Sequence, residues 1–73
     1  MTTKQRIAYR AAKAAKWRRV AEMLRGDLAR LTPGKAMYDD VEGAAHNLLN
    51  AAAFMDFINV QDLETLALEQ YNV

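Results

Sequence analysis

Apolar residues recur every three or four positions over residues 14–31, which is the period of an amphipathic α-helix. Thr32, Pro33 and Gly34 interrupt the pattern directly afterwards and predict the end of the helix. Gly26 stands inside this helix, and a close crossing with a second helix is one reason for a glycine there. The stripe consists of Ala14, Trp17, Ala21, Leu24, Leu28 and Leu31, with Val20 beside it.

A second stripe with the same period predicts a helix over residues 38–58. We expect Asp39 to cap this helix, with Glu42 three residues later in a capping-box arrangement. The competing start has Thr32 as the cap and Pro33 as the first helical residue. The stripe consists of Val41, Ala44, Ala45, Leu48, Ala52 and Met55.

The last turns of this second helix carry apolar residues that point away from its main stripe. They are Phe54, Phe57 and Ile58. We expect a short third helix over residues 60–70 to cover them, with Asn59 as its cap and Asp62 three positions later. This third helix would present Leu63, Leu66 and Ala67. A second subunit is the alternative cover.

The fold class that follows is all-α: one domain over residues 1–73, built as an antiparallel helical hairpin with a short third helix. No stretch alternates apolar and polar residues over the length of a strand. The chain has only 73 residues, and a core of this size supplies about 3 to 5 kcal/mol. We therefore predict a homodimer that forms a helical bundle. Its core and dimer contacts are expected from Trp17, Leu24, Leu28, Leu31, Val41, Leu48, Met55, Phe54, Phe57 and Ile58.

Charge is divided unequally between the two halves of the chain, although the net charge is only +1. All ten Lys and Arg residues lie within positions 1–35 with only two acids, whereas the remaining seven acids lie in residues 36–73 without a Lys or Arg. Either the halves neutralise each other within the fold or across a dimer, or the basic half faces an anionic partner.

Before residue 14 the apolar stripe becomes cationic, with Arg6, Arg10 and Lys13 at the corresponding positions. We expect residues 1–13 to form a basic extension, helical or frayed, that projects from the core. The alternative is a hairpin that turns near Gly34, in which Asp56, Asp62 and Glu64 neutralise Lys13, Arg10 and Arg6.

The basic helix is also the predicted contact surface for a partner, through Arg6, Tyr9, Arg10, Lys13, Trp17 and Arg18. An acidic or mixed protein surface is the expected partner, and binding of nucleic-acid phosphates is the alternative. A helix-turn-helix arrangement is disfavoured because the second helix, which would have to enter the major groove, carries acids and no cation.

Candidate chemistry elsewhere is sparse. His46 shares a helical face with Asp39 and Glu42, but a fourth metal ligand is missing, so we predict no metal, no cofactor and no small-molecule substrate. The chain has no cysteine, no phosphate-binding glycine loop and no activated nucleophile, and an enzyme is not expected. The uncharged run from Gly43 to Met55 is too short and too polar to cross a bilayer, and the N-terminus lacks the apolar stretch of a secretory signal. A cytoplasmic protein is expected.

No family motif is legible in the sequence. We predict a non-enzymatic interaction protein that binds another macromolecule and modulates it as an inhibitor or adaptor. A protein is the expected kind of partner. Small cysteine-free helical proteins of this style are common among accessory proteins of phages and mobile elements. The alternatives are a nucleic-acid-binding protein that uses the basic helix and a structural subunit of a larger assembly.

Overall fold

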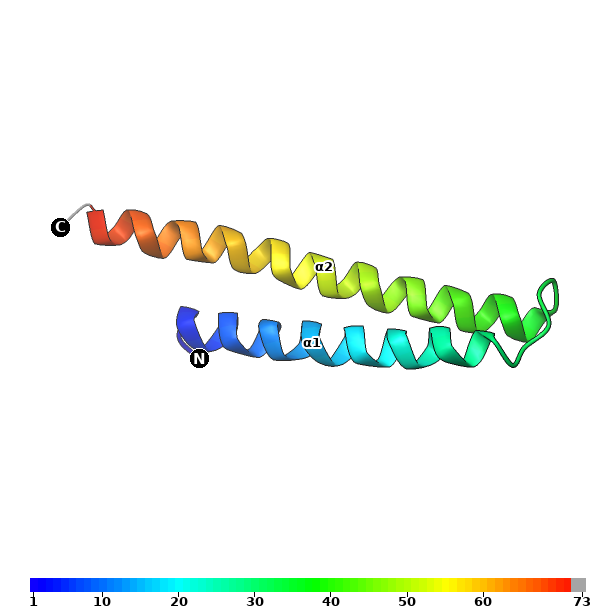
Figure 1. The fold of residues 1–73 in the computed structure, drawn as a ribbon. Helices are drawn as coiled ribbons and strands as arrows, with labels where there is room; N and C mark the ends of the chain where they lie inside the picture. Colours follow the sequence, from blue (N-terminus) through cyan, green and yellow to red (C-terminus); the bar gives the residue numbers. More distant parts are fainter. Residues whose placement is uncertain (72–73) are drawn as a thin grey trace.

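The computed structural model describes residues 1–71 and contains two antiparallel α-helices (Figure 1). Helix α1 spans Thr3–Leu28 and helix α2 spans Ala36–Tyr71. The two helices lie side by side along most of the molecule, and the C-terminal end of α2 extends past the start of α1 (Figure 1). The result is a rod of 59 × 16 × 16 Å. The predicted all-α helical hairpin is confirmed.

Helix α1 begins at a capping box that the sequence analysis did not identify. The hydroxyl of Thr2 accepts a hydrogen bond from the backbone N–H of Gln5 at 3.1 Å, and the Gln5 side chain accepts one from the Thr2 N–H at 2.8 Å. Two of the amide groups at the helix start are thereby satisfied. Helix α1 therefore begins at Thr3, well before Ala14, where the predicted apolar stripe begins.

Residues 1–13 do not project from the rest of the molecule, contrary to expectation. Residues 3–13 are part of the continuous helix α1, and Ile7, Arg10 and Lys13 are half-buried. The physical reason is that α2 is long enough to lie beside this segment and supplies polar partners for its cationic face. Packing of this segment against α2 does not require an apolar stripe, because Asn59 and Asp62 of α2 make polar contacts with it.

The connection between the helices covers residues 29–35 and includes the expected Thr-Pro-Gly interruption. Gly34 has φ = 85°, a conformation that L-residues with a Cβ rarely adopt. Helix α2 then starts at Ala36, earlier than predicted. The N–H of Asp39 donates to the Lys35 carbonyl, so Asp39 lies in the first turn and is not the cap. The competing start at Thr32 and Pro33 is wrong as well, because α1 and α2 are separated by these residues.

The third helix over residues 60–70 is not observed. Helix α2 continues without a break from Ala36 to Tyr71, and Asn59 is a buried interior residue of it and not a cap. Nothing after Gly43 interrupts the helix, since the described remainder contains neither Gly nor Pro. The side chain of Asn59 finds its hydrogen-bond partners on α1 and so does not compete with the helical backbone.

Small residues form the centre of the contact between the helices. The buried apolar residues are alanines, two from each helix: Ala14, Ala21, Ala45 and Ala52. They recur every seven residues within each helix, as in a coiled coil, and small side chains at such positions allow two backbones to lie close together. Ala44, which was assigned to the stripe of the second helix, is exposed.

Larger apolar side chains flank this centre and are only half-buried. They include Trp17, Leu24, Leu28 and Leu31 from the first half of the chain and Val41, Leu48, Met55 and Ile58 from the second. No large side chain within residues 1–71 is fully buried. The hairpin therefore has a contact seam between two helices and no enclosed core.

Candidate functional site

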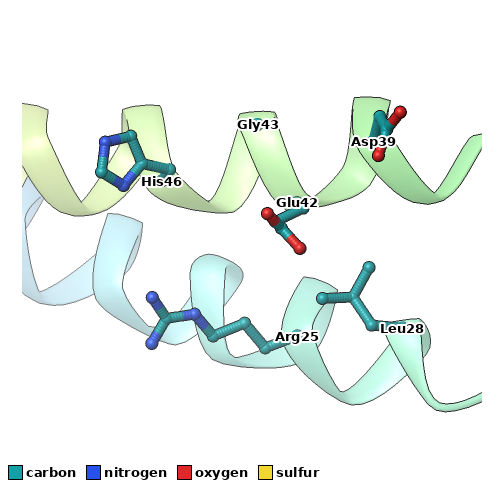
Figure 2. Close-up of a pocket in the computed structure, with 6 residues that line it drawn as sticks. All are labelled: Arg25, Leu28, Asp39, Glu42, Gly43 and His46. Atoms are coloured by element: carbon teal, nitrogen blue, oxygen red, sulfur yellow. The ribbon is translucent and has the colours of Figure 1, made fainter. Parts of the chain in front are cut away.

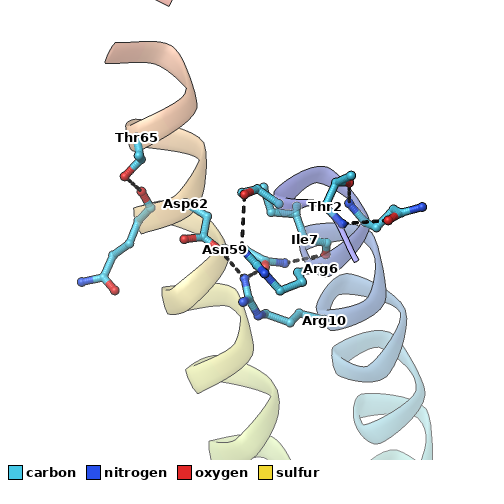
Figure 3. Close-up of polar contacts among 10 residues, drawn as sticks. Thr2, Arg6, Ile7, Arg10, Asn59, Asp62 and Thr65 are labelled. Carbon is cyan, nitrogen blue, oxygen red and sulfur yellow. Dashed lines mark hydrogen bonds and ion pairs between the residues drawn. The ribbon is translucent and has the colours of Figure 1, made fainter. Parts of the chain in front are cut away.

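A polar cluster joins the helices near the N-terminus of α1 (Figure 3). The Arg10 guanidinium lies 2.5 Å from the carboxylate of Asp62 and 3.3 Å from the Asn59 side-chain oxygen. The Asn59 amide in turn donates to the backbone carbonyl of Ile7 at 3.0 Å. Asn59 thus uses both ends of its amide between the helices, which stabilises the register at which α1 lies against α2.

A second ion pair lies closer to the middle of the rod. Arg18 of α1 pairs with Asp56 of α2, and both side chains are nearly half exposed, at 46% and 47%. In the cluster the corresponding values for Arg10 and Asp62 are 17% and 30%. A pair as exposed as Arg18–Asp56 contributes about 0 to 1 kcal/mol to stability. The less exposed pair Arg10–Asp62 therefore contributes more to holding the two helices together.

Of the three ion pairs considered across the hairpin, one is observed. Arg10 pairs with Asp62 as expected, whereas Asp56 pairs with Arg18 and not with Lys13. The Lys13 ammonium lies 5.5 Å from the centre of the Tyr9 ring, a cation–π arrangement within one helix. Arg6 donates to the hydroxyl of Thr3 and makes no ion pair within residues 1–71.

The six residues predicted to contact a partner therefore do not form one open surface. Arg6 and Tyr9 are exposed, but Arg10 and Arg18 are bound to acids of α2, and Trp17 is half-buried beside the helix contact. The cations of α1 that are exposed and outside both ion pairs lie partly elsewhere on the helix. They are Lys4, Arg6, Lys16, Arg19 and Arg25.

The hollow near the connection of the helices contains the histidine (Figure 2). Arg25 and Leu28 of α1 border it opposite Asp39, Glu42, Gly43 and His46 of α2. Figure 2 shows that Asp39, Glu42 and His46 point in different directions. Among the residues described, no three His, Cys, Asp or Glu side chains lie together in a way that would hold a metal ion.

The outward side of α2 carries exposed aromatic and aliphatic residues. Phe54 and Phe57 are 59% and 58% exposed, and Val60 and Leu68 are also more than half exposed. Leu63 is 52% exposed but borders a hollow together with Lys4 of α1. Ile58, which was grouped with the two phenylalanines, is half-buried. The third helix that was expected to cover this side is instead the continuation of α2, so nothing in the hairpin covers it.

The role of Asn59 was missed although the sequence contains a signal for it. Asn59 follows Ala45 and Ala52 at the same spacing of seven and so occupies the next position of the buried seam. The repeat of seven indicates a seam residue at this position, whereas the local spacing from Asn59 to Asp62 alone indicates a helix cap.

Neither α1 nor α2, within the described range, has a stretch both long and apolar enough to cross a bilayer. No family model, no curated protein and no solved structure matches this chain.

Proposed function

We propose that this protein is a non-enzymatic helical interaction protein of the cytoplasm, which binds another protein and modulates it as an inhibitor or adaptor. The observation that carries the proposal is the distribution of apolar side chains. Within residues 1–71, ten large apolar residues are more than half exposed, while the buried residues are four alanines and Asn59. Six of them, from Phe54 to Tyr71, lie in the second half of α2. Exposed apolar residues concentrated in one part of a small molecule are typical of a contact surface for another macromolecule.

The exposed cations of α1 favour an acidic or mixed partner surface. Lys16 and Arg19 stand one helical turn apart beside the exposed alanines Ala12 and Ala15, where a partner can approach the helix closely. Neither cation belongs to the two ion pairs of the hairpin. Their charge is thus available to an outside molecule, and complementary charge accelerates association and selects among partners.

The test is affinity capture from a host lysate with the wild-type chain and with the double variant Lys16→Glu/Arg19→Glu. We expect one or a few proteins to be retained by the wild type and lost from the variant. The matched control is Glu69→Lys, which changes an exposed charge on α2 and should leave capture intact. Equal capture by wild type and the α1 variant would show that this side of α1 is not the contact surface.

Nucleic-acid binding is the second candidate, and it is favoured by the same exposed cations. A labelled DNA duplex and a labelled single strand, titrated at about 50 and 200 mM salt, distinguish the two functions because each phosphate contact contributes about −0.9 to the slope of log K against log salt for duplex DNA. Tight binding that weakens steeply with salt, and that the Lys16→Glu/Arg19→Glu variant loses, would favour nucleic acid. The absence of binding at low salt would remove this candidate.

The third candidate, a structural subunit of a larger assembly, differs in its expected size. Light scattering would then give particles well beyond a dimer at micromolar concentration, whereas an inhibitor or adaptor would remain small.

A further inference from the structure

Another stripe, which we call the outer stripe, runs along α2 on the side opposite α1. It repeats with alternating spacings of four and three residues over about seven turns. Its members are Gly43, Asn47, Asn50, Phe54, Phe57, Gln61, Glu64 and Leu68, and all eight are exposed. At about 100° per residue these positions centre roughly half a turn from the buried seam of Ala45, Ala52 and Asn59. Helix α1 cannot cover them.

The hairpin leaves more surface exposed than a folded chain of its mass normally does. Its accessible area is 5611 Å² at 8.2 kDa, whereas a compact monomer of that mass exposes about 4,500 Å². The difference is about 1,100 Å² per chain, and a stable interface of standard size covers about 800 Å² of each partner. The hairpin thus has enough unburied surface for one full interface.

The outer stripe of one chain is complementary to the outer stripe of a second chain that runs in the opposite direction. We infer that two copies of this chain associate through it, with their α2 helices antiparallel and a two-fold axis between Phe54 and Phe57. Phe54 then faces Phe57 of the second copy, and Asn50 faces Gln61. At the ends, Asn47 faces Glu64 and Gly43 faces Leu68. A single two-fold interface of this kind closes on itself and gives a dimer.

The steric fit at the ends of the stripe supports this register. A Cβ atom added at Gly43 would meet nothing within 4 Å, so the hairpin itself does not require a glycine there. In the antiparallel pairing Leu68 of the second copy, which is 63% exposed in the hairpin, lies opposite Gly43, where no side chain occupies the space.

Charge supports the antiparallel direction. Between Asn47 and Leu68 the outer stripe contains one charged residue, Glu64. A parallel pairing in register would place the two Glu64 carboxylates against each other, whereas the antiparallel pairing separates them by about 25 Å along the helices. The basic α1 helices lie on the outside of such a dimer, so Lys16 and Arg19 stay exposed, while Phe54, Phe57 and Leu68 are covered. The dimer does not depend on the proposed function.

The first test measures mass by sedimentation equilibrium with the full chain. We expect wild type at twice 8.2 kDa and Phe57→Glu at the monomer mass, with at least a tenfold weaker association constant. The control is Met23→Glu, which replaces a residue of α1 that is 71% exposed and outside the stripe; this variant should remain dimeric. A monomeric wild type, or a dimer that persists in Phe57→Glu, would overturn the inference.

The second test fixes the direction without disturbing the phenylalanines. The chain has no cysteine, so Asn50→Cys and Gln61→Cys each carry one thiol. Two cysteines form a disulfide only when their Cα atoms lie within about 7 Å. Under mild oxidation the mixture of the two variants should form mixed disulfides, while each variant alone should not, because identical positions lie about 16 Å apart in the antiparallel dimer. Disulfides in the single variants, or none in the mixture, would contradict the proposed pairing.

Discussion

At the scale of single residues, the polar cluster shows how a cationic position enters a helix contact. Arg10 occupies a position of the α1 stripe at which an apolar residue would be expected, and Asn59 and Asp62 meet it from α2. Both of these partners are needed because a half-buried guanidinium has several donors and loses part of its hydration. The sequence reveals the charges, but the pairing depends on the register of the two helices.

The two ion pairs should differ in their contribution to stability. We predict that Asp62→Ala lowers the free energy of unfolding by about 1 to 2 kcal/mol, because it leaves the less exposed Arg10 without its carboxylate. The matched variant Asp56→Ala, which releases the more exposed Arg18, should cost about 0.5 kcal/mol or less. Urea denaturation followed by circular dichroism measures both. Equal losses would show that burial does not distinguish the pairs.

Two glycines should respond to alanine in opposite directions. Gly26 is exposed inside α1, and a Cβ there would meet nothing within 4 Å, so the close helix crossing that we expected at Gly26 is wrong. We predict that Gly26→Ala raises the midpoint of thermal unfolding and stabilises the protein by about 0.5 to 1 kcal/mol. Gly34→Ala should destabilise it by about 1 kcal/mol, because φ is positive at Gly34.

At the scale of helices, the alanine seam determines how closely α1 and α2 lie together. Each helix presents a small side chain every second turn, so the backbones approach and the larger residues are displaced to the flanks. The sequence predicts stripes from Ala14 to Leu31 and from Val41 to Met55. They lie along this seam except for Ala44, which is exposed, and Leu31, which lies beyond the end of α1 at Leu28. Periodicity is readable because it is local to each helix.

Adjacent alanines of α1 offer a direct test of this seam. Ala14 is 1% exposed, whereas Ala15 is exposed to solvent. We predict that Ala14→Leu costs about 1 to 3 kcal/mol of stability, because the added atoms force the helices apart. Ala15→Leu should change stability by less than about 0.5 kcal/mol. Thermal unfolding of the two variants measures both changes. If leucine at residue 14 does not lower the stability, the close approach of the helices at the seam is not required.

At the scale of the whole molecule, the hairpin is a rod and not a globule. Its radius of gyration is 17.0 Å, compared with about 11 Å for a compact domain of this length. Two rods joined along the outer stripe of α2 would lie nearly flush, because the middle of the stripe is close to the middle of α2. Dimer formation thus doubles the mass with little change in length.

Association and folding should be linked in this molecule. We predict that the midpoint of thermal unfolding of wild type rises by about 4 °C for a tenfold increase in protein concentration, because only the folded chain presents the outer stripe. The Phe57→Glu variant should show no such dependence. Calorimetry at three concentrations measures both, and a midpoint independent of concentration in the wild type would argue that the hairpin folds alone.

The sequence by itself determined the all-α class, the hairpin, the turn at Thr32–Gly34, most of the inner stripe and the division of charge. These features follow from helical periodicity, breaker residues and composition, which act over a few neighbouring positions. Only the tertiary structure decided that α2 continues through Asn59, that residues 3–13 pack against it, and that Arg10 and Arg18 face acids of α2. These features depend on which residues of distant segments contact each other. A polar residue with a partner on the other helix becomes part of the helix contact.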